Sequence, residues 1–167
     1  RRVSAYLMAG KVDGSPQRLE TPYNSKGSQI YGQGFLFDDH DSKASPLSTM
    51  RELNQEKRYA HRIFPYIGGE EVNSMPTPNP YRYAIYLSDL ETEEDLKAVP
   101  ALAAIVRERV KPERDKLGNN PNNTPLKKRW WAYQAHRPEL YTRLKARQKV
   151  LVHAQVGPHM EFSFLPP

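Results

Sequence analysis

The chain has 167 residues, no cysteine and a net charge of +6, and its length suits one domain. The lack of cysteine excludes disulfides, thiolate zinc sites, iron–sulfur clusters and cysteine nucleophiles. The sequence also has no run of about 18 apolar residues, the length that a membrane-spanning helix needs. Because the chain begins Arg1-Arg2-Val3, without methionine or a signal-like apolar run, we expect a fragment of a longer, cytoplasmic protein.

The first part of the chain is predicted to form strands and one short helix. β-Branched and aromatic residues predict strands over Val3–Ala9 and Gln29–Phe37, with turn residues between them. Ser48 or Thr49 is then expected to cap a helix that continues to about Tyr59.

The next part is predicted to place a stiff loop between two strands. The strand over Arg62–Ile67 should end at Gly68-Gly69. Three prolines at alternate positions make Asn73–Tyr81 an extended, stiff loop. A buried strand over Arg82–Leu87 and an acidic turn over Asp89–Asp95 follow.

The rest of the chain is predicted to be mainly helical until two closing strands. A helix should start after Pro100, because apolar residues recur at helical spacing, and Pro112 should interrupt it. An exposed loop then leads to the last predicted elements, which are helices over Pro125–His136 and Pro138–Arg147 and strands over Val150–Gln155 and Glu161–Leu165.

Together these elements predict an α+β fold, with a mixed or antiparallel sheet and a basic helical insertion. We expect one domain over residues 1–167, mainly strands and loops over about 28–100 and 148–167, and mainly helices over about 101–147. Ile105–Lys149 holds 13 Lys and Arg against 4 Asp and Glu, a local charge of +9. This concentration favours a polyanion partner, with nucleic acid the first candidate, although two solvated helices would also explain it.

Several short motifs are interpreted as structural. Gly32-Gln33-Gly34 lacks the third glycine and the helix of a phosphate-binding loop, which favours a bulge or a close backbone approach. Asp38-Asp39-His40-Asp41 is interpreted as a solvated turn, since four adjacent residues cannot converge on one ion. Asn79-Pro80-Tyr81 resembles the base-holding Asn-Pro-Pro-Tyr loop of adenine methyltransferases but lacks its second proline. We therefore expect no catalytic residue, metal site or cofactor in this chain.

The segment Lys127-Lys128-Arg129-Trp130-Trp131 is the local feature that most clearly suggests nucleic-acid binding. Its cations could grip a phosphate backbone and its indoles could stack on bases. On a helix the two indoles would lie about 100° apart, so at least one should pack into the core. We favour core tryptophans, with the cations left to contact a DNA backbone.

Six short segments follow one another in a recognisable order. They are Gln29–Phe35 with G-x-G-F, Arg62–Ser74 with PY-x-GG-E-E-x-N, Arg82–Ile85 with R-Y-x-I, Val106–Asp115 with V-K-P-E-R, Arg129–Tyr141 with R-W-W and R-P-E-L-Y, and Val156–Pro166 with F-x-F-L-P. In this order they resemble the target-recognition region of large single-chain restriction–modification methyltransferases of bacteria, types IIG and IIL.

The resemblance implies a module that reads double-stranded DNA beside an adenine-specific catalytic domain of the same parent chain. Binding of S-adenosylmethionine and methyl transfer would belong to that upstream domain. Gln155 and Pro158 stand where the family often has Arg and Lys, so base or backbone contacts there should differ.

Base reading requires polar side chains that are held rigidly against a groove, and phosphate contacts require exposed cations. The base readers that we predict are Asn79, Arg82, Gln155 and His159. The phosphate contacts that we predict are Lys26, Lys127, Lys128, Arg129, Arg143 and Arg147.

Three other functions remain open from the sequence. The basic helices could dock an acidic protein partner without any DNA specificity. The aromatic residues could instead stack on the unpaired bases of RNA. The fragment could also be an enzyme in its own right, which methyl transfer by the fragment alone would show.

Overall fold

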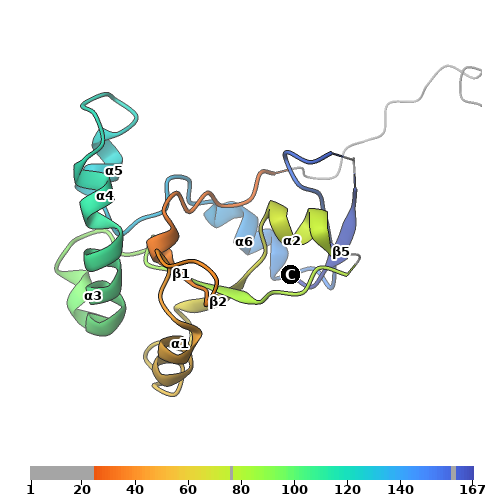
Figure 1. Ribbon diagram of the computed structural model, residues 1–167, viewed down its shortest axis with the longest axis horizontal. Coiled ribbons are helices and arrows are strands. Elements are labelled where there is room, and N and C mark those ends of the chain that lie inside the picture. Colours follow the sequence, from red (N-terminus) through yellow and green to blue (C-terminus); the bar gives the residue numbers. More distant parts are fainter. Residues whose placement is uncertain (1–24, 76, 159–160) are drawn as a thin grey trace, which may run out of the picture.

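The computed structural model describes residues 25–75, 77–158 and 161–167 and shows an α+β fold with small antiparallel sheets (Figure 1). The expected strand over Val3–Ala9 lies outside the described residues. Among the described helices, none has the length and apolar character needed to cross a membrane.

The central sheet has three strands in the order β1-β3-β2. β1 (Leu36–Phe37) and β2 (Ile63–Tyr66) each pair antiparallel with β3 (Arg82–Ile85). All three strands lie within longer segments that were expected to be extended.

The expected strand over Gln29–Phe37 is wrong for most of its length. Tyr31 has φ 49° and Gly32 has φ 130°, values that no strand accommodates, and the chain continues as a 3-10 helix, η1 (Gln33–Phe35). The close backbone approach expected at the glycine pair is confirmed at Gly34. A Cβ there would lie 2.7 Å from the Cβ of Arg109.

Two short helices flank β2 in the sequence. α1 (Leu47–Leu53) begins earlier than predicted and ends six residues before Tyr59, and neither Ser48 nor Thr49 caps it. The Asp39 carboxylate accepts the N–H of its first residue, Leu47, at 2.8 Å. α2 (Gly69–Ser74) occupies residues that were expected to be a strand stop and the start of a loop. The stiff loop is therefore shorter and begins only after α2.

The predicted helix after Pro100 is confirmed, with its interruption. α3 (Pro100–Arg109) follows a 3-10 turn, η2 (Asp95–Ala98), and α4 (Lys111–Asp115) carries Pro112 in its first turn. The buried members of the apolar stripe pack into the core; they are Leu102, Val106 and Val110.

The predicted helix over Pro125–His136 is wrong beyond its first turns. α5 (Thr124–Lys128) ends where Arg129 adopts φ −113° and ψ 62°. The next four residues are all buried, and a helix would point at least one of them away from the core. The expectation of core tryptophans is confirmed, since Trp130 and Trp131 are each only 3% exposed.

The C-terminal part is thinly packed. α6 (Pro138–Leu144) is followed by β4 (Val150–Val152) and β5 (Ser163–Leu165), which form a second antiparallel sheet. We call this pair the C-terminal sheet. No described residue from Pro138 onward is buried, so this part makes little use of the core.

Candidate nucleic-acid interface

A buried ion pair connects α2 to the central sheet. Glu71 is fully buried, and its two carboxylate oxygens accept hydrogen bonds from Nε and Nη2 of Arg82, both at 2.6 Å. The Gly68 N–H also donates to Glu71, at 2.9 Å. Burial alone would raise the pKa of Glu71, but these hydrogen bonds outweigh it and hold the pKa below its ordinary value.

Arg82 is enclosed on its remaining sides by rings. Its guanidinium lies 5.1 Å from the ring centroid of Tyr66 and 5.3 Å from that of Tyr81, and a second carboxylate, of Glu70, lies 3.6 Å away. Arg82 was expected to read a base, but the structure places it in this buried pair. Its part is to fix the position of α2 and of the loop that ends at Tyr81.

α2 in turn holds the loop that connects the strands of the C-terminal sheet. Asn73 donates from Nδ2 to the carbonyl of Val156 at 2.9 Å. The loop also approaches α2 at Gly157, where a Cβ would lie 2.7 Å from Oδ1 of Asn73. The buried pair, α2 and this loop therefore form one connected support.

Two of the predicted readers lie on segments that adjoin this support. Gln155 is exposed on the loop beside Val156, and Asn79 is exposed on the loop that leads to Tyr81. His159 lies outside the described residues. Figure 1 shows α2 and the C-terminal sheet together at one end of the molecule.

Three of the predicted phosphate contacts belong to the same half of the molecule. Arg143 lies on α6, and Arg147 follows it; both are exposed. Lys26, also exposed, precedes Ser28, whose hydroxyl accepts a hydrogen bond from Tyr141 of α6 at 2.7 Å. Lys26 therefore lies on a segment that is tied to α6.

The other three predicted phosphate contacts lie elsewhere. α5 stacks with α3 and α4 at the opposite end of the long axis, and this end carries Lys127 and Lys128. Arg129 is used inside the protein, because Nη2 donates to the carbonyls of Ser88 and Leu90 at 3.0 and 2.8 Å. The basic stretch of the sequence is therefore divided between the α5 end and the region of α6 (Figure 1).

A second set of hydrogen bonds, made by one buried arginine, connects several of the segments that carry the family resemblance. Arg114 of α4 is 1% exposed, and its Nη2 donates to the carbonyl of Tyr31 at 2.8 Å and, at longer range, to those of Ile30 and Ala132. The G-x-G-F segment, the V-K-P-E-R helix and the tryptophan segment therefore meet at one side chain.

Sequence reasoning missed an exposed apolar surface on the C-terminal sheet. Its residues were predicted only to close the fold as strands. Leu151 is 57% exposed and Phe164 is 70% exposed. β4 is apolar at all three positions, so the sequence offered no polar face from which the exposed side of this sheet could be predicted.

The acidic cluster forms a turn, as expected, but Asp38 is buried and not solvated. Asp38 accepts the N–H of His40 at 2.8 Å, and Asp41 accepts that of Lys43 at 2.9 Å. Among the described residues, no group of three or more histidines and acids is placed to hold a metal ion.

No protein-family model matches the chain, and neither a curated protein nor a solved structure does.

Proposed function

We propose that this chain is the sequence-recognition module of a DNA methyltransferase of the restriction–modification type. It would bind double-stranded DNA and position a target adenine for an upstream catalytic domain of the same parent chain. That domain would bind S-adenosylmethionine and transfer the methyl group.

The observation that carries the proposal is the pairing of Glu71 with Arg82. These residues come from two separate segments that resemble the family, PY-x-GG-E-E-x-N and R-Y-x-I, and they make a bidentate ion pair. A direct ion pair between residues of the two motifs supports the resemblance to this family. It also supports a rigid scaffold, which base reading needs.

The neighbouring exposed residues supply the chemistry of recognition. Asn79 and Gln155 carry amides, which can pair bidentately with an adenine edge in the major groove. Arg143 and Arg147 are exposed cations that suit phosphates. The proposal therefore assigns reading to the loops on the support and grip to α6 and its surroundings.

Selection of bound duplexes from a random-sequence pool tests this function. We expect the chain to enrich a short motif weakly, because one module offers few bidentate base contacts. Asn79→Ala and Gln155→Ala should each relax the motif at about one or two positions. Asn122→Ala, an exposed asparagine near α5, is the matched control and should leave the motif unchanged.

Binding without any enriched motif would contradict sequence recognition. Preference for an acidic protein partner, with no binding to DNA, would favour the protein-interaction alternative.

A further inference from the structure

Among the described residues, one face of the C-terminal sheet is exposed and is made of large apolar and aromatic side chains. Leu151 in β4 lies directly opposite Phe164 in β5. Two residues further along, just beyond the strand ends, His153 and Phe162 are in ring contact, with centroids 5.3 Å apart. If the alternation of the strands continues over these two residues, they lie on the same side of the sheet as Leu151 and Phe164. We call these four residues the open face.

The opposite side of the same sheet is turned toward the protein. Its residues are Val150, Val152, Ser163 and Leu165, and all of them are half-buried. On the open face, by contrast, Leu151, Phe162 and Phe164 are 57%, 54% and 70% exposed. Antiparallel sheets with one face in water normally direct polar side chains to that face, so the apolar open face departs from the usual pattern.

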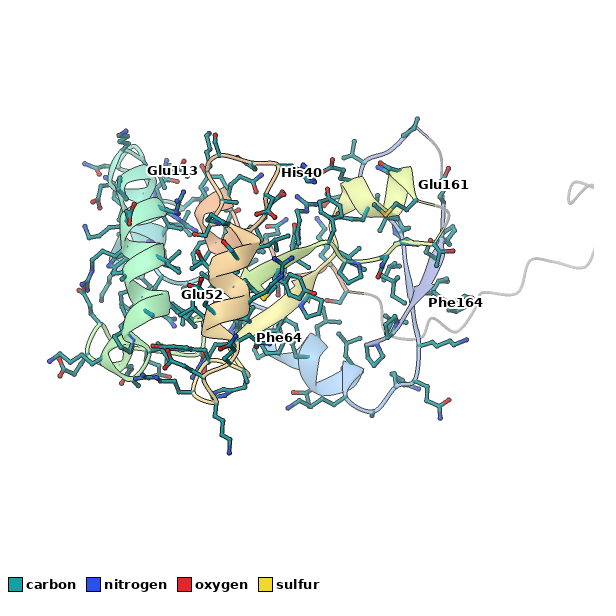
Figure 2. The ribbon with its side chains drawn as sticks, turned by 60° about the horizontal axis from the view of Figure 1, so that its bottom comes forward. His40, Glu52, Phe64, Glu113, Glu161 and Phe164 are labelled. Atoms are coloured by element: carbon teal, nitrogen blue, oxygen red, sulfur yellow. The ribbon has the colours of Figure 1, made fainter. Side chains whose placement is uncertain are left out.

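The position of the open face leaves it accessible. Figure 2 shows Phe164 on the C-terminal sheet, at the end of the molecule away from α4 and its Glu113. A contiguous exposed apolar patch of this kind marks a surface that a partner covers.

The surrounding charge indicates what kind of partner this is. Lys149 immediately precedes β4 and shares the alternation of Leu151 and His153, which places it at the edge of the open face. Arg147 and Arg143 continue the positive charge toward α6, and both are exposed. Aromatic rings with Lys149 at their edge and further cations on the adjoining segment match the two parts of a nucleotide: a base to stack on and a phosphate to neutralise.

We propose that the open face binds nucleobases of DNA that are out of the duplex stack, with Phe162 and Phe164 as the stacking rings. The inference rests on the proposed function, since it takes DNA as the partner. It adds that the module contacts DNA where the helix is locally opened. Adenine methylation requires such an opening, because the target base must leave the stack.

Fluorescence anisotropy with three labelled probes of one sequence tests the inference. The probes are a fully paired duplex, the same duplex with an unpaired bulge of about three nucleotides, and the single strand. We expect the chain to bind the bulged duplex about tenfold more tightly than the paired one, as stacking of one or two bases provides. The double variant Phe162→Ala, Phe164→Ala should lose this preference and keep its binding to the paired duplex.

Three further variants, with thermal melting of each, separate stacking from other effects. Phe164→Trp should retain the preference and report contact by quenching of its fluorescence on the bulged probe, whereas Phe164→Leu should lose much of the preference. Phe64→Ala removes an aromatic ring of similar exposure, 46%, from the central sheet and should change nothing in the probe comparison. Thermal melting of every variant checks the fold, which changes at exposed positions should leave intact.

Each result has one consequence. Equal affinity of the unaltered chain for paired and bulged duplexes overturns the open-face inference and leaves the proposed function standing. A preference that survives the double variant also overturns the inference. Tighter binding to RNA than to DNA of the same sequence, or no binding to any probe at low salt, overturns both proposals.

Discussion

At the scale of single residues, Glu71 does most to hold α2 on the central sheet. It is a fully buried carboxylate whose charge is compensated by Arg82. Glu71→Gln leaves the buried guanidinium without its counter-charge, and removal of one partner from a buried pair typically costs 3–5 kcal/mol. We expect the free energy of unfolding in urea to fall by about 3 kcal/mol.

The neighbouring Glu70 provides the control for this change. Its carboxylate is exposed and lies 3.6 Å from Nη2 of Arg82, so Glu70→Gln should cost less than about 1 kcal/mol. Equal losses for the two variants would show that the buried pair does not hold α2 in place.

The same residue predicts a dependence of stability on pH. The pKa of Glu71 is lowered in the folded state, so the unfolded chain binds a proton more readily. This contribution is complete above the ordinary glutamate pKa, near 4.5, and is lost as the pH falls through the lower folded value. The difference in unfolding free energy between the unaltered chain and Glu71→Gln should therefore shrink below about pH 4.5. A difference that is constant down to pH 2–3 would contradict the assignment.

At the scale of elements, the packing of η1 on the end of α3 depends on a missing side chain. A Cβ at Gly34 would lie 2.7 Å from the Cβ and 2.9 Å from the backbone carbon of Arg109, which cannot move without displacing the helix. We expect Gly34→Ala to destabilise the protein by about 1–3 kcal/mol in thermal melting, as overpacked cores do. Gly118→Ala, where the added methyl meets open space, should change stability by less than about 0.5 kcal/mol.

Elements that local rules define were predicted well. The start of α3 at Pro100, its break near Pro112 and the strands at Ile63 and Arg82 follow from proline geometry and apolar patterns. These signals lie within a few residues of the element they define, so a single sequence suffices to read them.

Elements that depend on distant partners were predicted poorly. α5 ends at Arg129 because the four residues that follow are all buried. The spacing of apolar residues in the sequence does not show that all four must be buried. α2 was missed because its first turn is stabilised by Glu71, whose buried role requires Arg82 eleven residues later. The same holds for the candidate site. Arg82 was predicted to contact a base, but its buried ion pair with Glu71 gives it a structural role.

At the scale of the whole molecule, the basic stretch of the sequence does not form a single basic surface. The basic stretch is divided, with Lys127 and Lys128 at the α5 end and Arg143 and Arg147 near α6 (Figure 1). If DNA lies along the loops that the support holds, Arg143→Ala with Arg147→Ala should weaken duplex binding at least tenfold. That pair should also reduce the salt slope by about two.

The lysine pair at the other end is the control for this prediction. Lys127→Ala with Lys128→Ala removes the same charge from α5 and should change affinity less than about threefold. The reverse order of effects would move the DNA to the α5 end and away from Asn79 and Gln155.

The most direct test of DNA recognition is the salt dependence of binding by the unaltered chain to a mixed-sequence duplex, measured by fluorescence anisotropy from about 25 to 300 mM salt. We predict a straight line of log affinity against log salt with a slope of about −3, because Lys26, Arg143 and Arg147 would each contact a phosphate. Absence of binding even at the lowest salt would contradict it.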